Sequence, residues 1–408
     1  MSDIQHYDYL IVGAGMAAAS AVEGIRKYDA EGSIGILGDE ADPPATRPAL
    51  SKKLWLDPSF SLQRIWMHPE EAPNTHLYLR HHVITLDRAC HTVRCSNGMS
   101  FHYHRLLIAT GGKPALQQLP PSERVIYFRT VADYRLLRAW THTDSAPRIV
   151  VVGGSWLGME LAAALCQQPE DIRINWIISQ QAVGCDRFPA ELSTWLEHQF
   201  TAHGVEIIAG NHVLQGDEND AEVALILEDG ADISADVVVM CTGITPCDEL
   251  ALTSDLATDN GIVVNEYLQT TDSDIFAAGD IACYPDAQLG YRRVEHVDNA
   301  QTMGNWAGRN MASTPTPYRH TPYFYTHLFG LDLKGIGHMS TELQLICHWQ
   351  TPPADNVMPC GVIIYIQDDS IIKGITLINI KDTHQGLAWA NKVLGTQDVT
   401  APAFLSCI

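Results

Sequence analysis

The chain has 408 residues, of which 46% are apolar, and a formal net charge of −22. This length and composition allow two or three domains with sizeable buried cores. The acidic balance argues against nucleic acid or an anionic membrane as the main partner, and no apolar run reaches the roughly 18 residues that span a bilayer. The N-terminal residues carry no signal-peptide pattern, so we expect a cytoplasmic location.

The first predicted elements form a strand, a glycine turn and a helix. Residues 8–12 (DYLIV) indicate a short buried strand, and residues 16–27 indicate a helix of small side chains. Between them, Gly13 suits a tight turn, Gly15 lets the backbone approach a pyrophosphate, and Ala18 permits close packing of the helix on the strand. This pattern is typical of a dinucleotide-binding site.

A second strand is predicted at residues 33–37, and it ends just before Asp39. In such folds a carboxylate at this place binds a ribose hydroxyl. A glycine pattern alone is weak evidence, but strand, turn, helix, strand and acid together predict that a dinucleotide is bound here.

A second glycine pattern lies in mid-chain at residues 153–158 (GGSWLG), between a strand at 147–152 and a helix at 159–166. Its middle glycine is replaced by Ser155, whose Cβ narrows the gap to a pyrophosphate, although its hydroxyl offers a hydrogen bond in return. The next strand, 172–178, ends at Ser179 and Gln180, with no carboxylate for a ribose and no base for a 2′-phosphate. The nearest downstream base is Arg187.

The remaining chain indicates a linker and a third domain. Residues 313–317 (STPTP) have the composition of a linker, and beyond them we expect strands, a hairpin turn at 367–370 and a helix at 383–394. The ten cysteines form no Cys-x-x-Cys pattern, and we interpret Cys90 and Cys95 as structural. His102 and His104 share a strand face without a third ligand in sight, so no metal site is expected.

Several segments carry a family resemblance. They are residues 47–55 (RPALSKKLW), 106–112 (LLIATGG), 276–280 (FAAGD), 293–300 (RVEHVDNA) and 360–379. Together with the two glycine patterns they resemble the flavoproteins of the ferredoxin-reductase and apoptosis-inducing-factor type over nearly the whole chain. The sequence departs from that pattern at Tyr325-Thr326-His327, where the family has Trp-Ser-Asp, and near Pro352, where a long family insertion is reduced to a few residues.

The resemblance implies FAD, bound without a covalent link, and a set of residues that contact it. The expected FAD-binding residues are Gly13, Gly15, Ala18, Asp39, Arg47, Lys52, Val83, Ala109, Thr110, Gly111, Asp280, Glu295, His296, Val297 and Tyr325.

The resemblance also implies a nicotinamide nucleotide at the second glycine pattern and a catalytic pair. The expected residues of this site are Gly153, Ser155, Leu157, Gly158, Glu160 and Gly243. Lys52 and Glu160 are the expected catalytic residues, since the family places them as an ion pair beside flavin N5. No metal is expected.

The predicted architecture is α/β, with two Rossmann-like nucleotide-binding domains, the second inserted in the first, and an α+β C-terminal domain. We expect an FAD-binding domain at residues 1–118 and 240–318, an NAD-type domain at 119–239 and an interface-type domain at 319–408.

The function predicted from these patterns is an FAD-dependent oxidoreductase. It would pass a hydride from NAD(P)H, with NADH favoured, to FAD N5 and then pass electrons to an unidentified ferredoxin, quinone, oxygen or small molecule. Two alternatives stay open. One is a redox-sensing interaction protein with a degenerate nicotinamide site. The other is an oxidase or dehydrogenase of a specialised organic substrate, in which Trp156 fills the empty adenosine groove. A redox protein partner and a homodimer are expected under the first reading.

Overall fold

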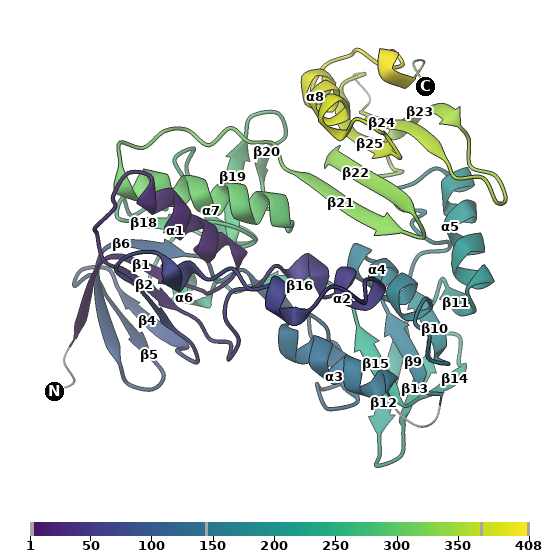
Figure 1. Cartoon of the computed structure of the whole chain (residues 1–408), viewed down its shortest axis with the longest axis horizontal. Coiled ribbons are helices and arrows are strands. Elements are labelled where there is room, and N and C mark those ends of the chain that lie inside the picture. The colour runs from purple at the N-terminus through teal and green to yellow at the C-terminus, as the bar shows by residue number, and fades with distance from the viewer. Residues whose placement is uncertain (1–3, 143–145, 368–369, 406–408) are drawn as a thin grey trace. The chain divides into compact units, whose positions relative to one another are not determined.

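The computed structural model describes residues 4–142, 146–367 and 370–405 (Figure 1). The chain divides into two compact units, of which unit 1 comprises Met1–Arg47, Leu62–Lys113 and Thr245–Pro322, and unit 2 comprises Pro48–Ser61, Pro114–Ile244 and Tyr323–Ile408. The chain passes from unit 1 to unit 2 within β7 (Gly112–Pro114) and returns within β16 (Ile244–Pro246). The three-domain division expected from the sequence stays a prediction.

Unit 1 contains a seven-stranded sheet with the order β3-β2-β1-β6-β5-β4, and β18 pairs with β6 outside this path. The strands are β1 (Gln5–Val12), β2 (Ile34–Leu37), β3 (Thr75–Tyr78), β4 (Val83–Asp87), β5 (Thr92–Cys95), β6 (Ser100–Ile108) and β18 (Ile275–Ala277). Pairs among β3, β2, β1, β6 and β18 are parallel, whereas β6, β5 and β4 form an antiparallel meander. The chain order reverses beside β1, which lies between β2 and β6.

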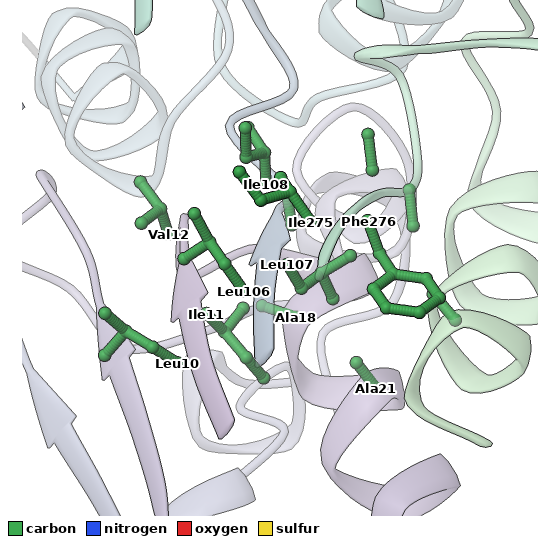
Figure 2. Packing of buried hydrophobic residues seen from close by; sticks show 14 of the residues in the cluster. Leu10, Ile11, Val12, Ala18, Ala21, Leu106, Leu107, Ile108, Ile275 and Phe276 are labelled. Atoms are coloured by element: carbon green, nitrogen blue, oxygen red, sulfur yellow. The ribbon is translucent and has the colours of Figure 1, made fainter. Parts of the chain in front are cut away.

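Two helices of unit 1, α1 (Met16–Arg26) and α7 (Val297–Ala312), pack closely against each other (Figure 1). Small side chains permit this approach: a Cβ on Gly304 or Gly308 of α7 would fall on the carbonyl oxygen of Ala17 or Ala21. Figure 2 shows how Ala18 and Ala21 of α1 border the core with apolar residues of β1, β6 and β18. The small residues that the sequence places after Gly15 are therefore required by packing on both faces of the helix.

The rest of unit 1 consists of short elements around this core. They are 3-10 helices at Leu62–Arg64 and Pro69–Glu71, α6 (Glu249–Leu252), β17 (Ile262–Val263), β19 (Ala282–Asp286) and β20 (Gly290–Arg292). A further 3-10 turn at Arg47–Ala49 crosses the boundary into unit 2.

Unit 2 begins with α2 (Lys53–Leu56) and contains a five-stranded parallel sheet of order β11-β10-β9-β15-β8. Its strands are β8 (Val125–Tyr127), β9 (Arg148–Val152), β10 (Arg173–Ile178), β11 (Val205–Ala209) and β15 (Val237–Met240). The associated helices are α3 (Val131–Thr141), α4 (Trp156–Leu165) and α5 (Ala190–Ala202), and a separate antiparallel sheet joins β12 (Val213–Glu218), β13 (Val223–Leu227) and β14 (Asp232–Ala235). β9 lies between β10 and β15, so this sheet repeats the reversal seen beside β1.

The C-terminal part of unit 2 is an antiparallel sheet of order β21-β22-β25-β24-β23. Its elements are β21 (Tyr323–Leu328), β22 (Leu331–Gly337), β23 (Gln344–Thr351), β24 (Cys360–Ile366), β25 (Ile372–Ile378), α8 (Thr383–Val393) and a 3-10 helix at Ala403–Leu405. The hairpin turn predicted at 367–370 includes residues 368 and 369, which lie outside the described residues.

The structure confirms the α/β fold class with parallel sheets. It also confirms the strand–turn–helix units predicted around both glycine patterns, although the mid-chain helix begins at Trp156 rather than at residue 159. The earlier start follows from Ser155, which caps the helix. Among the described residues, no helix combines the length and apolar character needed to cross a membrane.

Candidate nucleotide and flavin sites

The first glycine turn follows the carboxyl end of β1, at the point where the strand order reverses. Gly13 has a φ of +108°, and a Cβ there would fall on the carbonyl oxygen of Ala109. The Gly13 N–H donates to the Leu37 carbonyl at 2.8 Å, and the Ala109 N–H donates to the Val12 carbonyl at 2.7 Å. No residue other than glycine fits at Gly13, because the backbone conformation and the neighbouring strand both exclude a side chain.

The space beyond this turn is open and faces unused hydrogen-bond donors. No heavy atom lies within 4 Å of a Cβ placed on Gly15. Gly15 is the N-cap of α1, no side chain caps the helix, and no acidic residue occupies its first turn. The first N–H groups of a helix need acceptors, and a pyrophosphate is a suitable one. These residues therefore fit the phosphates of FAD.

The other expected FAD residues of unit 1 follow strand ends or begin α7. Thr110 and Gly111 follow β6, and the Thr110 hydroxyl donates to the Cys247 carbonyl at 2.9 Å. Asp280 follows β18, where the Arg293 guanidinium donates to its main-chain oxygen at 3.0 Å. Their position after parallel strands is where open α/β sheets bind ligands.

Three further residues of the expected FAD set, Glu295, His296 and Val297, lie at the start of α7. Arg293 pairs with Glu295 at 2.6 Å, and the Nδ1 atom of His296, the N-cap, accepts from the Asp298 N–H at 3.2 Å. Val297 is the first residue of the helix. Asp39, another residue of the set, follows β2 and is exposed. The remaining residues of the list in unit 1 are Ala18 in α1, Val83 at the start of β4, and Arg47, which pairs with Glu40.

The second glycine turn repeats the first in detail. Gly153 has a φ of +118°, and a Cβ there would lie 2.5 Å from the carbonyl oxygen of Cys241. The Gly153 N–H donates to Ile177 at 2.9 Å and the Cys241 N–H donates to Val152 at 2.8 Å, which matches the bonds of the first turn. Gly158 lies against this turn, because a Cβ there would fall on the Gly153 carbonyl. The backbone of a dinucleotide site is therefore retained.

Ser155 distinguishes the second turn from the first. Its φ of −68° and ψ of 170° suit any residue, so serine causes no backbone strain. The hydroxyl donates to the Cys241 carbonyl at 2.9 Å and accepts from the Gly158 N–H at 3.3 Å. The sequence left open that this hydroxyl donates to a phosphate. In the structure its proton is already donated to the Cys241 carbonyl, and the Gly158 N–H of the helix is occupied as well.

A cavity of about 410 Å³ opens beside the second turn. Its lining residues come from the carboxyl ends of the parallel strands and the loops that follow. They are Gln117, Gln118, Leu119, Val152, Gly153, Gly154, Ser155, Ile177, Ser179, Gln180, Arg187, Asn211, His212, Val213, Met240, Cys241, Thr242 and Gly243. Of the residues predicted for this site, Gly153, Ser155 and Gly243 line the cavity, whereas Leu157, Gly158 and Glu160 do not.

Trp156 does not fill this cavity, and that interpretation of the sequence is wrong. Its ring packs at 4.3 Å from the ring of Phe324 on β21 and at 5.6 Å from Phe188, measured between centroids. The Arg187 guanidinium lies over the indole at 4.9 Å from the ring centre. Trp156 is therefore part of the packing between α4 and the C-terminal sheet. The groove beside it stays open.

The expected catalytic pair is present in unit 2. Lys52 Nζ lies 2.6 Å from Glu160 Oε1, and the two side chains are 14% and 9% exposed. Lys52 Nζ also lies 5.9 Å from the centre of the Tyr325 ring. A buried ion pair is stable only when further hydrogen bonds compensate for lost hydration.

Two hydroxyl groups provide that compensation, and the sequence did not single them out. Ser51 Oγ donates to Glu160 Oε2 at 2.5 Å, and Thr326 Oγ1 donates to Glu160 Oε1 at 2.7 Å. Both carboxylate oxygens of Glu160 are thus occupied. Ser51 adjoins Lys52 in the segment that carries the resemblance, and Thr326 adjoins Tyr325, so their neighbours in sequence were the available signal.

The structure also describes nine cysteines and the side chains that could bind a metal ion. These nine cysteines are all free. Burial, and to a lesser extent the charge of Glu160, raises the pKa of the Cys241 thiol far above its usual range. Cys241 therefore stays protonated. No group of three or more potential metal ligands occurs in the described part of the chain.

Comparison with known proteins identifies the family. Residues 7–304 match the family model of the pyridine nucleotide-disulphide oxidoreductases. The chain belongs to this family. It is accordingly an oxidoreductase, a flavoprotein with FAD and a nicotinamide nucleotide as cofactors, and it resembles the ferredoxin reductases within the family.

Individual relatives agree along most of the chain. The protein is 31% identical over 406 residues to "Apoptosis-inducing factor 1, mitochondrial" of Dictyostelium discoideum, covering 91% of this chain and 76% of that protein. It is 31% identical over 341 residues to the "5,5'-dehydrodivanillate O-demethylase ferredoxin reductase subunit" of Sphingobium, covering 81% and 82% of the two chains. Among solved structures, the covalent putidaredoxin reductase–putidaredoxin complex matches with a TM-score of 0.85 and 26% identity, covering 98% of this chain and 95% of that one.

Proposed function

We propose that this protein takes a hydride from a nicotinamide nucleotide bound at the second glycine turn onto FAD bound at the first. The electrons then pass to an acceptor that is not part of the chain. This proposal assigns to the flavin the FAD-binding residues that the sequence predicted. It assigns the cavity beside Gly153, Ser155 and Gly243 to the nucleotide.

The observation that carries the proposal is the open cavity at the second turn. A nucleotide-binding fold retained only for packing has no need to keep this groove free of side chains. Here about 410 Å³ remains, although Trp156 stands next to the turn and could have filled it. The cavity therefore supports continued use of a nucleotide.

Lys52 and Glu160 are proposed to act on the transferred charge. FAD, when bound, supplies the chemistry of hydride acceptance and electron storage. In this proposal the Lys52 ammonium group would supply a positive charge to balance the negative charge of a reduced flavin ring. Glu160, held by Ser51 and Thr326, would keep Lys52 in one position.

The acceptor is proposed to be a redox protein of the ferredoxin type. Several relatives are named as ferredoxin reductases, and one solved neighbour is a complex of a reductase with putidaredoxin. The net charge of −22 means that an acidic ferredoxin would need a locally basic docking face.

The test is direct reduction of the flavin. Purified protein is mixed without oxygen with NADH and separately with NADPH, and the visible absorbance of the flavin is followed. We expect rapid bleaching with at least one nucleotide, and reoxidation on addition of a ferredoxin. If neither nucleotide bleaches the flavin at millimolar concentration, the proposed function is wrong. If bleaching occurs but ferredoxin leaves the flavin reduced while a quinone or oxygen reoxidises it, the acceptor assignment alone fails.

A further inference from the structure

The rim of the cavity beside the second glycine turn lacks the group that normally selects NADH. Ser179 and Gln180 follow β10, and Asn211 and His212 follow β11, so these residues occupy the place where the adenosine ribose is read in such folds. NADH-specific sites put a carboxylate there, which accepts from the ribose hydroxyl and repels a 2′-phosphate. None of the described residues lining this cavity is aspartate or glutamate.

Arg187 reaches the same rim, although it lies eight residues beyond Ser179 in the sequence. Its guanidinium lies on the Trp156 ring, and its side chain is only 13% exposed, so its position is well defined. A guanidinium is the side chain best matched to phosphate oxygens, and holding it in place lowers the entropy lost on binding.

The hydrogen bonds of Arg187 leave part of the guanidinium available. Nε donates to Asp186 Oδ1 at 3.1 Å, and NH2 donates to Asp186 Oδ2 at 2.7 Å and to the Gly154 carbonyl at 3.4 Å. NH1 makes no such bond within the described part of the chain. Asp186 reduces the net positive charge at the rim, and its carboxylate is directed to Arg187 and to the Gln180 amide.

We infer that this cavity accepts NADPH at least as well as NADH, with the 2′-phosphate received by Arg187 and the Ser179 hydroxyl. The inference rests on the proposed function, because it concerns the nucleotide of the same site. It reverses the preference for NADH that the sequence favoured. Because Asp186 shares the guanidinium, the selection for NADPH is modest.

The first experiment compares the two nucleotides in the holoenzyme. We expect kcat/KM for NADPH, measured with ferricyanide as the electron acceptor, to be between one and about ten times that for NADH, since one shared charge-assisted bond contributes little more than 1.4 kcal/mol. A kcat/KM for NADH that exceeds the value for NADPH would overturn the inference while leaving the proposed function in place.

A binding measurement separates the cavity from the redox reaction. Calorimetric titration of the oxidised holoenzyme with 2′,5′-ADP and with 5′-AMP reports on the adenosine end alone. We expect 2′,5′-ADP to bind at least as tightly as AMP. If neither NADH nor NADPH reduces the flavin but 2′,5′-ADP still binds more tightly, the proposed function fails and the phosphate site stands. Tighter binding of AMP would overturn the inference.

Substitutions at the rim test the residues themselves. Ser179→Glu should restore a repelling carboxylate and lower the NADPH/NADH ratio of kcat/KM by about tenfold or more. Gln181→Glu adds the same charge two residues further along, at an exposed residue outside the cavity lining, and should change the ratio by less than about threefold. Asp186→Asn should raise the ratio, because it releases the guanidinium. Equal effects of Ser179→Glu and Gln181→Glu would contradict the assignment.

Discussion

Nζ of Lys52 lies 2.6 Å from Oε1 of Glu160. The same carboxylate receives the hydroxyls of Ser51 and Thr326, so three donors from two separate segments meet on one buried acid. Such an arrangement fixes the position of the pair, because loss of any one donor removes an interaction from a buried carboxylate. This relationship, rather than either residue alone, is the best-defined feature of the proposed catalytic site.

Glu160→Gln tests the pair. The amide oxygen can still accept a hydrogen bond, but the charge that holds Lys52 is lost. We expect the rate of flavin reduction to fall by about 10- to 100-fold, as charge-assisted hydrogen bonds contribute about 1.5–3 kcal/mol. The FAD content should stay unchanged. Anaerobic rapid mixing gives the rate, and the absorbance spectrum gives the FAD-to-protein ratio.

The matched control for this substitution is Glu206→Gln, at an exposed glutamate on β11 that pairs with Asn175. It removes the same charge from the same unit and should leave the reduction rate unaltered. An unchanged rate in Glu160→Gln would remove Glu160 from the mechanism.

Thr326→Val tests the hydroxyl support. Valine matches threonine in volume but leaves Oε1 of Glu160 with one donor fewer, and Thr326 is only 1% exposed. We expect the free energy of unfolding to fall by about 1–3 kcal/mol. Denaturant titration followed by circular dichroism gives this value. Thr326→Ser, which keeps the hydroxyl, should recover most of the loss, and equal stability of the valine variant and the native protein would refute the role.

Local sequence patterns predicted the backbone of both sites and missed contacts that join distant segments. The turns at Gly13 and Gly153 follow from short-range requirements, since positive φ and close packing leave glycine as the only choice. The Lys52–Glu160 pair was expected from a resemblance, and the structure contains it. The bond from Thr326 to Glu160 spans 166 residues. No periodicity or spacing encodes such a contact.

The positions of the Arg187 and Trp156 side chains also could not be predicted from local sequence. The sequence identified Arg187 only as the nearest base downstream of Ser179, and the loop before α5 brings it to the cavity rim. One alternative reading of the sequence placed Trp156 in the groove, but Phe188 and Phe324 provide an aromatic surface that it contacts instead. Side-chain direction depends on what the tertiary fold places nearby, and that information is not local.

Acid should destabilise unit 1 through His102. Burial is the largest cause that lowers its pKa below the ordinary 6.5, and the charges of His6, His104 and His91 act in the same direction. The folded state therefore binds fewer protons than the unfolded state, and the stability is complete above the unfolded pKa and is lost as pH falls through the folded one. Unfolding midpoints at pH 8 and pH 5 should differ less in His102→Gln than in the native protein. An identical difference in both would exclude His102 as a source.

Ser155→Gly tests whether the serine weakens nucleotide binding. Glycine in place of an N-cap serine costs only a few tenths of a kcal/mol, so the fold should persist. The change frees the Gly158 N–H and removes the Cβ that faces the cavity. We expect the Kd for NADP⁺ to decrease by about three- to tenfold, as one gained hydrogen bond contributes about 1 kcal/mol. Titration calorimetry on the oxidised holoenzyme measures it.

Ser155→Ala separates the two effects of the serine. Alanine loses the hydroxyl, which frees the Gly158 N–H and the Cys241 carbonyl, but it keeps the Cβ. If the Cβ is the obstacle to the pyrophosphate, the alanine variant binds NADP⁺ like the native protein and only the glycine variant improves. If the occupied N–H is the obstacle, both variants improve. Binding by Ser155→Gly that is no tighter than native binding would mean that the serine costs this site nothing, and that its affinity is set at the rim near Arg187.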